Sequence, residues 1–156
     1  MKRFLLPLML VLGCSACAAT PLATSHEDAP HSVVLDNHHF SVELATTNVM
    51  RARGLMDRTQ LAADHGMLFV FAHQAPQTFW MKDTLIPLDI LYFDKNRRLV
   101  SMQLNVPPCK ADPCPIYPSN KPAKYVLELQ AGMAVRIGAS VGDELTIKGR
   151  IGNVEP

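Results

Sequence analysis

Residues 79–94 read Phe79-Trp80-Met81-Lys82-Asp83-Thr84-Leu85-Ile86-Pro87-Leu88-Asp89-Ile90-Leu91-Tyr92-Phe93-Asp94 and contain the only tryptophan of the chain. Charged and hydroxyl side chains interrupt an otherwise apolar run. A strand that only fills a core has little use for them, because a buried polar group is unfavourable unless it is hydrogen-bonded. The stretch therefore predicts a buried strand over residues 88–94 and a functional site within residues 79–89.

The size and composition of the chain indicate one globular domain. It has 156 residues, of which 48% are hydrophobic, which is enough to build a core. The formal net charge is only +1. Because nucleic-acid binding needs a basic patch or stripe, we expect no nucleic-acid partner.

Residues 1–17 predict a secretory signal peptide. Lys2 and Arg3 form its charged region, and residues 4–13 form an apolar run that is too short to span a bilayer alone. One cleavage site resembles a bacterial lipobox and would leave a lipidated Cys14. The other, around Cys17, resembles an ordinary signal-peptidase site. Either one predicts a mature protein in the periplasm or cell envelope, and lipidation would anchor it to the membrane.

Residues 18–31 are small and polar, and they predict a flexible tether between the leader and a domain that spans residues 32–156. Histidines in and near the tether could bind a metal, although exposed histidines are common in such segments. The eight methionines are typical of core filling rather than of a copper site. Phosphate-loop, nucleophile-elbow and zinc motifs do not occur in the sequence. We therefore expect no cofactor and no metal.

Cys109 and Cys114 lie five positions apart around an Asp-Pro pair. In an oxidising compartment this spacing predicts a disulfide that closes a small loop. A metal or redox pair is the alternative. It is disfavoured because no histidine lies nearby and the spacing is not Cys-x-x-Cys.

Hydrophobic periodicity and turn residues predict about seven short strands and two short helices, and hence a mainly β, sandwich-like or barrel-like single domain. Residues 107–122 hold six of the twelve prolines and are expected to be irregular. The expected strands cover residues 32–35, 39–45, 67–71, 88–94, 99–106, 124–129 and 143–148, and the expected helices cover residues 48–53 and 131–137.

Several motifs, in this order and spacing, resemble the domain of unknown function 192 family over about residues 32–149. The resemblance implies a small, often exported bacterial or archaeal protein with a mainly β, jelly-roll-like fold, and it implies no particular reaction. Many members carry asparagine where this chain has Asp83. The motifs are Arg53-Gly54-Leu55-Met56, Arg58, Gly66-Met67-Leu68-Phe69-Val70-Phe71, Phe79-Trp80-Met81-Lys82-Asp83-Thr84, Ile86-Pro87-Leu88-Asp89-Ile90, Tyr125-Val126-Leu127-Glu128, Gly132, Gly138 and Gly142-Asp143.

The distinctive residues suggest a pocket for a small polar ligand such as a saccharide. Trp80 offers a flat apolar platform, and polar groups close to it offer hydrogen bonds. Arg53 could bind a carboxylate or phosphate on the ligand. In a regular strand, alternate side chains would face opposite sides, unless a bulge near Pro87 intervenes. The expected ligand-binding residues are Arg53, Trp80, Lys82, Asp83, Thr84 and Asp89.

Structural roles are the alternative for the same residues. Trp80 would fill the core, Asp89 would anchor a loop, and Lys82 would pair with a surface carboxylate. Arg53 and Arg58 would tie loops to the domain through carbonyl groups or carboxylates.

Three functions remain open from the sequence. The first is a non-catalytic domain that binds a small ligand or a partner. The second is an enzyme that acts on an envelope carbohydrate through Asp89 and Glu128 as paired carboxylates. The third is a structural envelope protein without a ligand.

Overall fold

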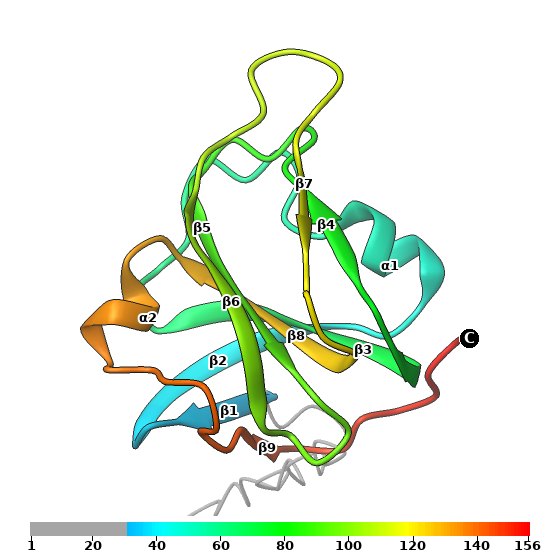
Figure 1. The fold of residues 1–156 in the computed structure, drawn as a ribbon, viewed down its shortest axis with the longest axis vertical. Coiled ribbons are helices and arrows are strands. Elements are labelled where there is room, and N and C mark those ends of the chain that lie inside the picture. The colour runs from blue at the N-terminus through cyan, green and yellow to red at the C-terminus, as the bar shows by residue number, and fades with distance from the viewer. Residues whose placement is uncertain (1–30) are drawn as a thin grey trace, which may run out of the picture.

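The computed structural model describes residues 31–156 (Figure 1). The predicted signal peptide, the lipidation site at Cys14 and all but the last residue of the tether lie outside the described residues.

The described chain forms nine strands and two short helices. Seven strands make one sheet in the order β6-β5-β8-β3-β2-β1-β9, and β4 pairs with β7 in a separate two-stranded ribbon. All pairings are antiparallel except that of β2 with β3. The elements are β1 Ser32–Leu35, β2 His38–Ala45, α1 Asn48–Arg53, β3 His65–Ala75, β4 Thr78–Trp80, β5 Leu88–Phe93, β6 Leu99–Val106, β7 Ile116–Pro118, β8 Ala123–Gln130, α2 Met133–Arg136 and β9 Thr146–Lys148.

The mainly β, sandwich-like single domain with two short helices agrees with the sequence prediction. Local signals explain several of its boundaries. Asp36 and Asn37 join β1 to β2 with φ angles of 46° and 62°, which a tight hairpin turn requires. Thr47 accepts a hydrogen bond from the backbone N–H of Met50 and caps α1, and Gly54 ends the helix at a φ of 48°.

The three central strands β5, β8 and β3 are buried on both faces. Side chains of one face pack with α2, and those of the other pack with the β4–β7 ribbon. Figure 1 shows where α2 and the ribbon lie relative to the sheet. Gly66 lets β3 lie close to β8, because a Cβ there would be 2.5 Å from the carbonyl oxygen of Glu128. The fold thus consists of one curved sheet with a separate cover on each face.

Aromatic contacts hold the ribbon against the sheet. The ring of Phe79 in β4 packs edge-on between Phe69 and Tyr92, with centroid distances of 4.9 and 5.9 Å. The hydroxyl of Tyr92 donates a 2.7 Å hydrogen bond to the carbonyl of Tyr117 in β7. These contacts fix Trp80, the next residue of β4, at the outer surface.

One sequence expectation was wrong, and one alternative that the sequence left open is resolved by the structure. Residues 107–122 contain a short strand, β7, because Ile116–Pro118 pairs with β4 in spite of the flanking prolines. Residues 79–84 are not a regular strand: β4 ends at Trp80, and Asp83 adopts a φ of 52° in a turn. The strand is therefore interrupted well before Pro87. The side chains of Lys82, Asp83 and Thr84 do not follow the alternating directions of a regular strand.

The helices have six and four residues, far fewer than the roughly 20 residues that cross a bilayer. No helix among residues 31–156 is therefore a candidate membrane span.

Candidate functional site

Glu128 is a buried acid on a central strand. It lies on β8 directly between Met67 of β3 and Ile90 of β5, and it is 4% exposed. Burial alone raises the pKa of its carboxyl from 4.5 to about 8. At neutral pH Glu128 therefore carries a proton and can donate a hydrogen bond.

Glu128 borders a cavity of about 30 Å³ between α1 and the ribbon. A polar cavity of this size has room for a water molecule or for one small polar group. Glu128 is the only carboxylic acid among the residues that line it, which are Arg51, Ala52, Arg53, Gly54, Leu55, Met56, Phe69, Phe79, Trp80, Lys82, Thr84 and Glu128.

Four of the six expected ligand-binding residues lie at this cavity: Arg53, Trp80, Lys82 and Thr84. Trp80 is 50% exposed, so it does not fill the core. Thr84 is buried, and its hydroxyl donates a 3.3 Å hydrogen bond to the carbonyl of Lys82. The end of β4 and the turn after it thus bring Trp80, Lys82 and Thr84 to the same cavity.

Asp83 does not line this cavity. Its positive φ reverses the chain, and its carbonyl accepts a 2.8 Å hydrogen bond from the backbone N–H of Asp57. The side chain is exposed and borders a separate hollow beside the cysteine loop. Asp83 therefore shapes the turn through its backbone.

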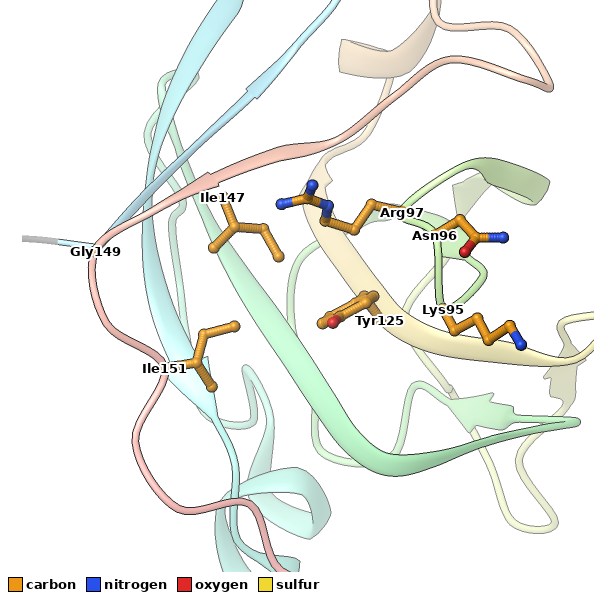
Figure 2. Close-up of a pocket in the computed structure, with 7 residues that line it drawn as sticks. All are labelled: Lys95, Asn96, Arg97, Tyr125, Ile147, Gly149 and Ile151. Carbon is orange, nitrogen blue, oxygen red and sulfur yellow. The ribbon is translucent and has the colours of Figure 1, made fainter.

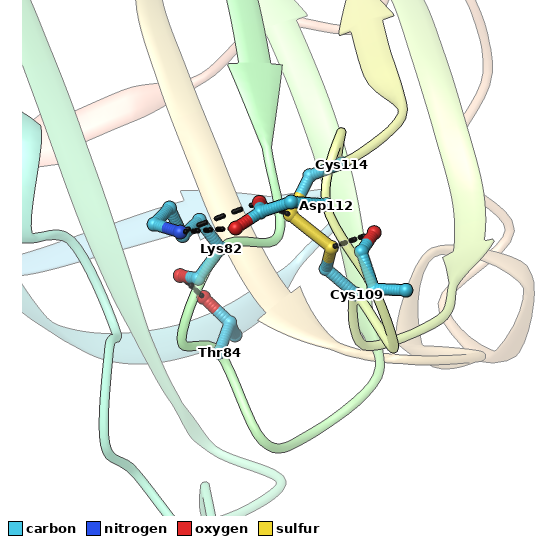
Figure 3. Close-up of a disulfide and its surroundings, with 6 residues drawn as sticks. Lys82, Thr84, Cys109, Asp112 and Cys114 are labelled. Atoms are coloured by element: carbon cyan, nitrogen blue, oxygen red, sulfur yellow. Dashed lines mark hydrogen bonds and ion pairs between the residues drawn. A yellow bond between two sulfur atoms is a disulfide. The ribbon is translucent and has the colours of Figure 1, made fainter.

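The predicted disulfide between Cys109 and Cys114 is confirmed, with their Cα atoms 5.5 Å apart. Its loop presents Asp112 to Lys82, and the two side chains form a 3.1 Å ion pair (Figure 3). The pKa of Lys82 is raised by its hydrogen bond to Asp112. The structural alternative for Lys82 was an ion pair with a surface carboxylate. Asp112 provides that carboxylate.

Asp89 belongs to the opposite face of the sheet. It is fully buried, and its two carboxylate oxygens accept 2.8 Å hydrogen bonds from the backbone N–H groups of Asn105 and Ala134. Asp89 therefore anchors the end of β6 and the start of α2. It has the structural role considered from the sequence, and it does not reach the Glu128 cavity.

The proposed pairing of Asp89 with Glu128 as two catalytic acids is wrong. Glu128 is the direct partner of Ile90, whereas Asp89 is the direct partner of Leu129. Directly paired residues share a face and successive residues alternate, so the two carboxyl groups point to opposite sides of the sheet. They cannot flank one glycosidic bond.

The three arginines near α1 have different roles. Arg58 forms two 2.7 Å hydrogen bonds with Glu43 at the surface. Arg53 is exposed at the cavity. Arg51, which belongs to none of the sequence motifs, donates 2.9 Å hydrogen bonds to the carbonyls of Thr46 and Val70. Ties to backbone carbonyls, expected of Arg53 or Arg58, are therefore made by Arg51.

Arg51 could not have been recognised from a local motif. Its carbonyl partners lie in two separate segments, and a further 2.9 Å hydrogen bond reaches the carbonyl of Glu155 near the end of the chain. The sequence shows that arginines gather in and after α1, but not which of them points inward.

The model of a family described as "Uncharacterized ACR", domain of unknown function 192, matches residues 31–147. The chain belongs to this family. No curated protein matches the chain.

Two solved structures of high similarity agree with this assignment. A protein of Sinorhizobium meliloti 1021, described as a candidate transcription regulator, is 40% identical with a TM-score of 0.69, covering 76% of this chain and 94% of its own. A protein of unknown function from Novosphingobium aromaticivorans DSM 12444 is 34% identical with a TM-score of 0.68, covering 83% and 94%. These relatives support the fold and name no ligand.

Removing the acid at residue 128 should change how stability depends on pH. In the unfolded state Glu128 titrates near 4.5, whereas in the folded state it keeps its proton up to about pH 8. Between these values the folded state binds more protons, so the free energy of unfolding should fall as the pH rises. Glu128→Gln should remove this fall and be more stable than the wild type by several kcal/mol above pH 8. Urea unfolding across this range would measure the effect.

The matched control for that series is Glu144→Gln, because Glu144 is half-exposed and pairs with Arg98 at the surface. It should keep the pH dependence of the wild type. Equal pH slopes for the wild type and Glu128→Gln would contradict a protonated, buried Glu128.

The loss of Asp89 should affect stability without affecting the cavity. Asp89→Ala leaves the buried N–H of Ala134 and the partly buried N–H of Asn105 without their partner and should lower the free energy of unfolding by about 2 kcal/mol. Trp80 lies on the other side of the sheet, so its fluorescence in the folded variant should match the wild type. Denaturant unfolding and emission spectra test both points. A marked shift in the emission of folded Asp89→Ala would show that Asp89 communicates with the cavity.

Proposed function

We propose that the chain is an exported, non-catalytic domain that binds a small polar ligand at the Glu128 cavity. The observation that carries the proposal is the convergence of a protonated, buried acid with a half-exposed tryptophan and three cationic residues. These groups come from β8, β4, α1 and the turn after β4. A site of this kind, with an apolar platform and a few polar groups, is typical of small-ligand binding.

The size of the cavity limits how a ligand can bind. A volume of about 30 Å³ admits one hydroxyl or carboxylate group, which would accept the proton of Glu128 in a hydrogen bond. The rest of the ligand would lie outside, against Trp80. A sugar ring fits this description, because it has an apolar face for the indole ring and hydroxyl groups for the cavity.

The charges around the cavity favour a saccharide that carries an acidic group. Asp112 already pairs with Lys82, whereas Arg53 has no ion pair in the part of the chain that the structure describes. A guanidinium group that is free of an internal partner can bind a carboxylate through two parallel hydrogen bonds. We therefore expect a uronic acid to bind more tightly than the matching neutral sugar.

Hydrolysis of a glycoside is not supported, because it generally needs two acids that flank one bond, and Glu128 is the only acid at the cavity. The Sinorhizobium meliloti protein is described as a regulator, but the charge of the present chain does not support a nucleic-acid-binding role. The formal net charge of this chain is only +1, and nucleic-acid binding generally uses a basic patch.

Because Trp80 is the only tryptophan, its emission reports directly on the site. A panel of neutral sugars and uronic acids, including glucose and glucuronate, should contain members that shift the Trp80 emission and raise the melting temperature. Trp80→Ala should weaken binding of such a sugar about tenfold through the loss of ring stacking, measured by calorimetry. Glu128→Met should also weaken it, because it removes the proton donor.

Asp83→Asn is the matched control, because asparagine tolerates the positive φ at this position and its side chain lies outside the cavity. It should bind as the wild type does. If no sugar changes either signal, or if Glu128→Met binds with unchanged affinity, the proposal is wrong and a structural role becomes the better explanation.

Export rests on the leader at residues 1–17 and on the disulfide, since disulfides persist in oxidising compartments. We further propose lipidation of Cys14 as the membrane anchor. Mass spectrometry of the protein purified from bacterial membranes should show a lipid-modified Cys14 at the N-terminus. An unmodified N-terminus at Ala19 would contradict lipidation while keeping export, and a retained leader would contradict both.

A further inference from the structure

A second hollow, of about 590 Å³, lies between the β5–β6 turn, β8, β9 and the segment that follows β9 (Figure 2). Tyr125 of β8 pairs with Val70 and Phe93, and all three side chains belong to the face that packs with α2. Glu128 faces the other side of the sheet. The hollow is therefore separate from the Glu128 cavity, and its volume is typical of small-molecule sites.

The turn that forms one wall of this hollow is held firmly. The side chain of Asp94 accepts hydrogen bonds of 2.8 and 2.9 Å from the backbone N–H groups of Asn96 and Arg98. The carbonyl of Arg97 accepts a 2.9 Å hydrogen bond from Leu145. The position of Arg97 is thus set by the backbone on both sides of the turn.

Arg97 is an unexpected residue at this position. Its φ is 63°, in the left-handed region, where asparagine or glycine is more favourable than arginine. Local folding alone would favour a different residue. Strained backbone positions persist where the surroundings or the function require them. The presence of an arginine side chain at this position therefore needs an explanation.

The guanidinium group of Arg97 has no ion pair in residues 31–156, whereas the next residue, Arg98, pairs with Glu144 at 2.9 Å. No acidic residue lines the hollow. Figure 2 shows the side chain of Arg97 extending toward Ile147 beside the ring of Tyr125, while Lys95 and Asn96 point away. The positive charge therefore faces an open space without an internal counter-charge.

We propose that this hollow binds a small carboxylate on a flat apolar body, such as an aromatic acid. The guanidinium of Arg97 matches the geometry of a carboxylate. Tyr125, Ile147 and Ile151 supply an aromatic ring and two aliphatic side chains for the rest of the ligand. Contact with these three side chains would favour an organic acid over an inorganic anion.

Benzoate is a suitable probe, and two-dimensional ¹H–¹⁵N NMR of the mature protein can map where it binds. Benzoate should shift the amide signals of Arg97, Tyr125 and Ile147 in a saturable way. Benzamide, which has the same shape without the charge, should bind about tenfold more weakly or not at all, because it cannot form the charged hydrogen bonds. Inorganic phosphate should also bind more weakly than benzoate.

Arg97→Asn is the decisive variant, because asparagine suits the positive φ and the protein should melt at the same or a higher temperature than the wild type. It should lose benzoate binding. Arg98→Gln removes a neighbouring charge from the same turn and should keep it.

Unchanged benzoate affinity in Arg97→Asn would overturn the proposal. So would signal shifts centred on Trp80 and Glu128 instead of Arg97, or equal binding of benzoate and benzamide. Because the two cavities lie on opposite faces, failure here would leave the saccharide proposal untouched.

Discussion

The pairing of β8 with β3 on one side and β5 on the other forms the centre of the sheet. These strands are buried on both faces, so the fold needs a cover on each side. One face packs with α2, whose first turn is anchored by Asp89. The other face is covered by the β4–β7 ribbon, and α1 and the cysteine loop flank it. Where the ribbon and α1 do not quite meet, the cavity at Glu128 remains.

Two carboxyl groups on neighbouring central strands have different roles because their surroundings differ. Asp89 accepts hydrogen bonds from two backbone N–H groups. Glu128 lies between Met67 and Ile90, where burial favours the neutral acid. One residue therefore holds the fold together, and the other is a hydrogen-bond donor at a cavity. A sugar hydroxyl or carboxylate is the kind of group that such a donor can bind.

Much of the fold could be predicted from the sequence, because its signals are local. The hairpin at Asp36-Asn37, the cap at Thr47 and the buried run at residues 67–71 each depend on neighbouring residues. The strand at Ile116–Pro118 was missed because it exists only through pairing with β4. The turn at Asp83 was missed because the residue lies in an otherwise strand-like run.

The candidate site was only partly predictable, because some of its features are local in the sequence and others depend on strand pairing. Trp80, Lys82 and Thr84 stand out as polar or aromatic anomalies close together in the sequence, and the structure places all three at one cavity. The separation of Asp89 from Glu128 depends on the register of β5 against β8, which composition does not reveal. Arg97 looks like an ordinary turn residue until its φ angle and its unpaired side chain are seen.

The proposed ligand site depends on Glu128 keeping its proton at neutral pH inside the cavity. Carbon-13 NMR of side-chain carboxyl groups measures this directly, with the Glu128 signal assigned by its absence in Glu128→Gln. We expect a midpoint at about pH 8 for Glu128, well above the value of about 4.3 for ordinary glutamates. A Glu128 midpoint within the range of the exposed glutamates would contradict it.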